Sequence, residues 1–145
     1  VDFCEINPRH HATILKNIRE NGIAENRIAI FGDDPLSQIP KDTRYDYILA
    51  NPPYIDPLLA DRTEKSVTAY EQEEALWGGE KGLHFIYRII QEAPAFLKKN
   101  ATLYIEHEPE QAEAIRTYAT AHGYVSVAHH TDQYGVTRIS TLHTA

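Results

Sequence analysis

Four residues near the middle of the chain could hold a planar nitrogen group for a transfer reaction. They are Asn51-Pro52-Pro53-Tyr54, and they follow an apolar run over residues 45–50 that is typical of a strand. Neither proline has an N–H, and a residue before proline is held in extended geometry, so this loop offers hydrogen-bond acceptors and few donors. The Asn51 side-chain oxygen and the Pro52 carbonyl can accept both hydrogens of one substrate NH2 group, while the Tyr54 ring can stack on a flat amide or base.

This arrangement favours methylation of an amide or amino nitrogen. The lone pair of such a nitrogen is delocalised, and fixing both hydrogens favours the geometry in which the lone pair localises and faces a methyl donor. Catalysis would then come from positioning and from polar groups already arranged for charge developing on nitrogen, without a strong general base. A strand can also end in a proline-containing loop with no function. The position of the motif after an apolar strand favours the functional interpretation.

Acidic residues follow two other apolar runs. Glu5 ends the first run of the chain, and Asp33 and Asp34 follow the run that closes at Gly32. An acid at the end of a strand can accept both hydroxyls of a ribose, which Glu5 fits by position, although a solvated acid is the alternative. Asp33 or Asp34 could meet an adenine amino group, but Gly-Asp is also common turn chemistry.

The order of the expected elements predicts an α/β fold. Strands alternate with helices, which predicts a mostly parallel sheet covered on both faces, and two closing strands without a helix between them predict an antiparallel hairpin at one edge. Ligands of such sheets bind beyond the carboxyl ends of the strands. Strands are expected over 1–5, 27–31, 45–50, 102–106, 124–129 and 136–142, helices over 7–22, 83–97 and 109–122, and loops over 33–43 and 55–80.

Composition narrows the class of protein. The 145 residues fit one domain, and the net charge of −7 without basic stripes argues against nucleic acid as the main partner. No apolar run approaches the length of a membrane span, and a single cysteine suits a reducing cytoplasm, which is the expected location.

Two other groups of residues favour structural roles. The eight histidines have no spacing typical of a metal site, so no metal is expected. Glu106, Glu108 and Glu110 lie around a strand end and a helix start, where capping and solvation are the expected roles.

The chain resembles the release-factor glutamine methyltransferases, the HemK/PrmC family, along essentially its whole length. The Asn-Pro-Pro-Tyr element alone is shared with adenine-N6 and other amino methyltransferases, whereas the Gly-Gly-x-x-Gly-Leu stretch that follows it points to the glutamine branch. The matching segments are Asn51-Pro52-Pro53-Tyr54-Ile55, Tyr70-Glu71, Ala75-Leu76, Gly78-Gly79-Glu80-Lys81-Gly82-Leu83, Tyr87-Arg88-Ile89-Ile90, Leu103-Tyr104-Ile105-Glu106-His107, Gln111-Ala112, Gly123-Tyr124 and the closing hairpin.

The resemblance implies a class I methyltransferase fold with S-adenosyl-L-methionine (AdoMet) as donor. It implies that the acceptor is the glutamine side chain in the Gly-Gly-Gln loop of a peptide chain release factor. By the family pattern Glu5 takes the ribose position and Asp33 or Asp34 the adenine side. Asn51, Pro52, Pro53 and Tyr54 form the catalytic loop that holds the amide, with Asn51 also at the donor site. An adenine or guanine methyltransferase of DNA or RNA, and an inactive remnant, are the alternatives.

The chain also departs from the family pattern. It has Glu71-Gln72 where the family usually has Glu-Pro, and His107-Glu108 where Glu106 is usually followed by a small residue and glycine. The first strand and the glycine-rich AdoMet loop, which precede Glu5 in the family, have no counterpart here. Residues 1–145 are therefore expected to be a partial catalytic domain with two unpaired strand edges and poor activity in isolation.

Overall fold

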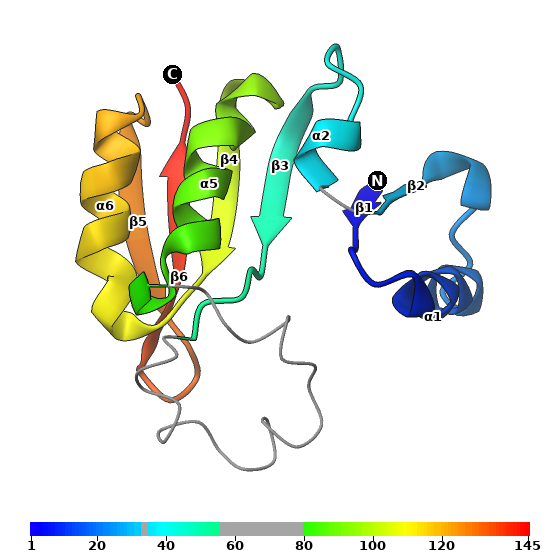
Figure 1. Ribbon diagram of the computed structural model, residues 1–145, viewed down its shortest axis with the longest axis horizontal. Helices are drawn as coiled ribbons and strands as arrows, with labels where there is room; N and C mark the ends of the chain where they lie inside the picture. The colour runs from blue at the N-terminus through cyan, green and yellow to red at the C-terminus, as the bar shows by residue number, and fades with distance from the viewer. Residues whose placement is uncertain (33–34, 56–79) are drawn as a thin grey trace. The chain divides into compact units, whose positions relative to one another are not determined.

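The structure, a computed structural model, describes residues 1–32, 35–55 and 80–145. It divides into two compact units, Val1–Thr43 and Arg44–Ala145, which are described in turn (Figure 1). Within the described ranges, no helix combines the length and the apolar character that crossing a membrane requires.

The N-terminal unit is built on a parallel pair of strands. Strands β1 (Asp2–Cys4) and β2 (Ala29–Phe31) pair with Phe3 opposite Ile30. Helix α1 (Pro8–Glu20) joins them, and the Asn7 side chain caps it by accepting a hydrogen bond from the Arg9 N–H. A 3-10 turn, η1 (Glu25–Arg27), delays the start of β2, and the short helix α2 (Pro35–Gln38) occupies part of the stretch that was expected to be a loop.

The C-terminal unit contains a mixed four-stranded sheet. Its strands are β3 (Tyr45–Ala50), β4 (Leu97–Glu106), β5 (Ser126–Thr131) and β6 (Thr137–His143), in the order β3-β4-β6-β5. The β3–β4 pair is parallel and the other two pairs are antiparallel, so the predicted closing hairpin is confirmed. Helices α5 (His84–Glu92) and α6 (Ala112–Ala121) lie on one face of this sheet (Figure 1).

The core of this unit lies between the two helices and the sheet. The helices contribute Ile86, Ile90 and Ile115, and the sheet contributes Leu103 and Leu142, all with no exposed surface. The helix expected over 83–97 is shorter than predicted. A proline cannot donate the helical hydrogen bond, so α5 ends at Glu92. The 3-10 turn η4 (Ala93–Ala95), which contains Pro94, follows it, and β4 begins at Leu97.

Strands β1 and β3 each have a partner on only one edge within the described residues, as expected. Tyr47 and Leu49 on β3 are 63% and 78% exposed, so this edge strand presents apolar side chains to solvent. Such an edge is a place where another strand can pair.

Candidate active site

The catalytic loop predicted from the sequence leaves the sheet at the carboxyl end of β3. Ala50 lies opposite Ile105 in the register, and Asn51 to Tyr54 follow directly. Asn51 is exposed and Pro52 is buried. Within the described part of the chain, neither the Asn51 side chain nor the Pro52 carbonyl takes a hydrogen bond from another residue. Among the described residues, both acceptors named in the sequence prediction therefore lack a protein donor.

The Tyr54 side chain is tied to the end of the neighbouring strand. Its hydroxyl donates to Glu106 Oε1 at 2.9 Å. Burial, and then this hydrogen bond, raise the pKa of Tyr54 well above its ordinary value, so the hydroxyl stays a donor. Capping or solvation was the role expected for Glu106, and the structure adds a contact that was not predicted, because its carboxylate accepts from the loop. Parallel strands end at the same edge, and this adjacency of β3 and β4 is the signal that could have predicted the contact.

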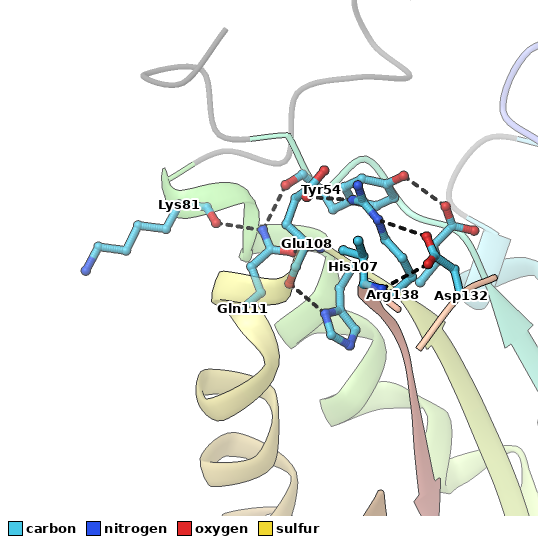
Figure 2. Close-up of polar contacts among 9 residues, drawn as sticks. Tyr54, Lys81, His107, Glu108, Gln111, Asp132 and Arg138 are labelled. Carbon is cyan, nitrogen blue, oxygen red and sulfur yellow. Dashed lines mark hydrogen bonds and ion pairs between the residues drawn. The ribbon is translucent and has the colours of Figure 1, made fainter. Parts of the chain in front are cut away.

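The Tyr54 backbone is held by a different residue. Gln111 Nε2 donates to the Tyr54 carbonyl at 2.8 Å and to the Lys81 carbonyl at 2.8 Å (Figure 2). Gln111 Oε1 accepts from the Glu108 N–H at 2.9 Å, and the residue is only 5% exposed. A role for Gln111 is not among the sequence predictions. The Glu-Pro-x-Gln spacing of a helix start would have indicated the cap but not the contact with the loop.

A charged pair lies beside the loop. Arg138 from β6 donates to Glu108 Oε2 at 2.6 Å and lies 4.0 Å from Asp132 Oδ2 (Figure 2). Glu108 and Gln111 also form a reciprocal capping box at the 3-10 turn η5 (Pro109–Gln111), which confirms the capping role expected for Glu108. The hydrogen bond to Glu108 raises the pKa of Arg138, so this guanidinium keeps its charge.

The side chains of His107, Ser140 and His129 form a hydrogen-bonded row that begins at the residue after Glu106. The buried His107 contacts the Glu108 carbonyl through Nδ1 at 2.7 Å and Ser140 Oγ through Nε2 at 2.7 Å. Ser140 Oγ also lies 2.8 Å from His129 Nδ1. A carbonyl only accepts, so neutral His107 carries its proton on Nδ1, Ser140 donates to Nε2, and His129 Nδ1 donates to Ser140. Burial lowers the pKa of both histidines, which favours these neutral forms.

Glu5 lies at the carboxyl end of β1 in the N-terminal unit. Its Oε1 accepts from the Asn7 N–H at 2.7 Å, and its Oε2 lies 3.5 Å from His10 Nδ1. The side chain is 31% exposed, so the carboxylate keeps lone pairs accessible to hydroxyl donors, which fits a ribose diol. His11 Nε2 lies 2.8 Å from the Glu5 carbonyl, a contact that the sequence analysis did not anticipate. Asp33 and Asp34 lie outside the described residues.

In the described ranges, no group of three or more histidine, cysteine or acidic side chains is arranged to hold a metal ion.

The sequence of this chain matches release factor glutamine methyltransferases, although it matches no protein-family model. The protein of that name from Pasteurella multocida is 33% identical over 124 residues, covering 86% of this chain and 40% of that protein. The one from Geobacter sulfurreducens is 30% identical over 135 residues, covering 93% of this chain and 46% of that protein. The chain thus spans less than half the length of these curated relatives.

Solved structures show the same fold. A methyltransferase from Pyrococcus furiosus matches with a TM-score of 0.66 at 17% identity, covering 99% of this chain and 61% of that one. A methyltransferase complexed with SAH matches with a TM-score of 0.65 at 10% identity, covering 99% and 38%. The release factor-specific protein-(glutamine-N5) methyltransferase from Alicyclobacillus acidocaldarius matches with a TM-score of 0.54 at 16% identity, covering 99% and 78%.

The fold is therefore the α/β fold of class I AdoMet-dependent methyltransferases, with antiparallel strands at its C-terminal end. Within this class, the chain is a homologue of the release factor glutamine methyltransferases, the HemK/PrmC family, as its motifs indicate.

Proposed function

We propose that these residues form part of an AdoMet-dependent enzyme that methylates the glutamine side chain in the Gly-Gly-Gln motif of peptide chain release factors. The observation that carries the proposal is the pattern of hydrogen bonds in the Asn51–Tyr54 loop after β3. Within residues 1–32, 35–55 and 80–145, Asn51 and the Pro52 carbonyl accept no hydrogen bond, while Tyr54 is fixed through both its hydroxyl and its carbonyl. A rigid loop with two free acceptors suits an NH2 group. The names of the homologous proteins support glutamine as the group that carries it.

The chemistry assigned to the loop is positional. Asn51 Oδ1 and the Pro52 carbonyl would accept the two amide hydrogens, and the half-buried Tyr54 ring would stack against the amide plane. Because the Tyr54 hydroxyl is occupied by Glu106, the tyrosine serves as a surface and not as a proton acceptor. The amide nitrogen is thereby presented in one orientation, which lowers the entropic part of the barrier to methyl transfer.

Glu5 is the residue proposed to hold the donor. AdoMet, when bound, supplies an electrophilic methyl group, and its ribose hydroxyls would donate to the Glu5 carboxylate. The Asn7 N–H, which donates to Oε1, orients the carboxylate, and Oε2 lies 3.5 Å from the exposed His10 ring, which would have to share this oxygen with a ribose hydroxyl. Asp33 and Asp34 stay predictions for the adenine side, as does Asn51 for the donor site.

The partner and location follow from the same proposal. The substrate would be a folded release factor that offers one exposed glutamine, and the cytoplasm is the proposed location, because a single cysteine suits a reducing compartment.

The test is methyl transfer from labelled AdoMet to three acceptors. These are an intact release factor, the same factor with its Gly-Gly-Gln glutamine replaced, and duplex DNA. The enzyme would be this chain, and also a longer version that includes any coding sequence before Val1. Label on the intact factor alone is the expected result. Equal label on the replaced factor, or label on DNA, would refute the glutamine assignment and favour another acceptor nitrogen.

A pair of matched variants tests the role of the loop. Asn51→Ala should abolish transfer to the intact factor, because one of the two acceptors is lost. Asn17→Ala removes an exposed asparagine from α1 and should leave transfer unchanged. Equal activity of the two variants would contradict the role given to Asn51.

A further inference from the structure

The Asn51–Tyr54 loop after β3 can be hydrogen-bonded to the rest of the structure at few points. Pro52 and Pro53 have no N–H, so the loop cannot be fastened by backbone donors at its centre. It is fixed at its start, where Ala50 pairs with Ile105 in the sheet. Its other fixed point is Tyr54, whose carbonyl accepts from Gln111 and whose hydroxyl donates to Glu106. Asn51 lies between these two fixed points, so its location depends on both.

The amide of Gln111 is fully used by this attachment. Its two N–H groups donate to the carbonyls of Tyr54 and Lys81, and its oxygen accepts from the Glu108 N–H. Burying an amide costs free energy unless its hydrogen bonds are made, and an apolar side chain of similar volume would fill the same space without that cost. The three hydrogen bonds therefore specify where three backbone segments meet, which apolar packing would not do.

The segment that contains Lys81, the second carbonyl partner of Gln111 Nε2, has a backbone conformation that brings it close to the Asn51–Tyr54 loop. Lys81 and Gly82 have φ angles of 53° and 67°, in the left-handed region that glycine adopts most easily. A Cβ atom on Gly82 would collide with the Tyr54 carbonyl oxygen and with Gln111 Nε2. The backbone of the η3 turn (Glu80–Gly82) therefore lies so close to the Tyr54 carbonyl that no side chain fits between them at Gly82.

We propose that Gln111 is a positioning residue for methyl transfer. It holds the Asn51–Tyr54 loop through the Tyr54 carbonyl, and Gly82 provides the space that this hydrogen bond needs. Gln111 makes no contact with the substrate in this proposal, and it acts on the reaction only through Asn51 and Tyr54. The inference rests on the methyltransferase function proposed above.

The first test separates binding from turnover. Gln111→Met keeps the volume of the side chain and removes both donors. Gln91→Met makes the same change at an exposed position of α5 and is the matched control. In the longest active version of the protein, Gln111→Met should lower kcat about 10- to 100-fold, because small misplacements of reacting groups cost that much, while KM for AdoMet changes less than about twofold. A kcat within about twofold of the control would overturn the proposal.

A second variant gives a signal that loss of packing cannot produce. In Gln111→Glu, one carboxylate oxygen can still accept from the Glu108 N–H, but the other faces the Tyr54 and Lys81 carbonyls without a proton. When the carboxyl is protonated it can donate to one of them. The kcat of Gln111→Glu relative to wild type should therefore rise at least about threefold as the pH falls from about 8 to about 6. The relative kcat of Gln111→Met should not rise. Identical pH profiles for the two variants would contradict the proposal.

A third measurement does not depend on activity. In 15N-labelled protein, Gln111→Met should shift the backbone amide signals of Asn51, Tyr54 and Ile55 and leave those of β5 and β6 in place. Gln91→Met should shift none of these. Gly82→Ala, which pushes the loop from the other side, should shift the same loop signals. Unchanged loop signals in Gln111→Met would refute the positioning role. If wild type methylates no release factor but the loop signals shift, the proposed function fails and the attachment by Gln111 stands.

Discussion

The hydrogen bond between Tyr54 and Glu106 joins the loop to β4, one of the two inner strands of the C-terminal sheet. It measures 2.9 Å and involves a phenol and a carboxylate, both partly buried. A hydrogen bond to a charged group contributes about 1.5–3 kcal/mol, and partial exposure to water lowers that figure. We therefore expect Tyr54→Phe to lower the free energy of unfolding by about 1–2 kcal/mol.

A double-mutant cycle isolates this bond from the other effects of each substitution. The free energy of unfolding would be measured by urea titration, followed by circular dichroism, for wild type, Tyr54→Phe, Glu106→Ala and the double variant. The interaction free energy should be about 1 kcal/mol. Tyr134 is 81% exposed, so Tyr134→Phe combined with Glu106→Ala is the matched control and should show no interaction.

The pH dependence of the interaction follows from the direction of the pKa shift. Burial and the Glu106 carboxylate raise the pKa of Tyr54 above its ordinary value of about 10. A group whose pKa is raised in the folded state stabilises fully below its unfolded pKa, and the stabilisation is lost as the pH rises through the folded pKa. The interaction free energy should therefore be equal at about pH 6 and about pH 9. A value below about 0.3 kcal/mol, or its disappearance by pH 9, would refute the reasoning.

Three further predictions test other contacts. Burial lowers the pKa of His107, so the stability that the neutral ring contributes is present above about pH 6.5 and is lost as the pH falls through the lower folded pKa. His107→Asn should flatten this loss of unfolding free energy in urea titrations at successive pH values. An equally steep loss in the variant would contradict the prediction. Glu5→Ala should weaken AdoMet binding about tenfold in calorimetry on the longer version, and unchanged affinity would exclude Glu5 from the donor site. Arg138→Ala should cost less than about 1 kcal/mol of unfolding free energy, because the Arg138 and Glu108 side chains are 35% and 37% exposed, and a larger loss would show a buried role.

The fold was predictable from the sequence because its elements have strong local signals. The cap at Asn7, the apolar run before Asn51 and the apolar face of α5 each specify an element by local chemistry. The predicted bounds of an element were wrong where contacts between distant parts of the chain determine the structure. Residues 97–101 extend β4 because they lie beside the start of β3, with Tyr45 opposite Leu97, and no periodicity within that stretch indicates a strand.

The site was predictable only in part. The loop Asn51–Tyr54 was identified because two prolines and an asparagine at a strand end are unusual together. The residues that hold the loop were not identified, because Glu106 and Gln111 lie 52 and 57 positions away along the chain. A glutamate at a strand end has an ordinary solvation role in most proteins, and only the register of β3 with β4 shows that this one faces Tyr54.

The departure at His107 is accommodated without disturbing the loop. A large polar side chain replaces the small residue that usually follows Glu106 in the family, and it is fully buried. Its cost is offset because both ring nitrogens are satisfied, one by the Glu108 carbonyl and the other by Ser140. Glu106 is the last residue of β4 and accepts from Tyr54, whereas His107, the residue after the strand, contacts Ser140. The hydrogen bond between Tyr54 and Glu106 is therefore compatible with a buried histidine at position 107.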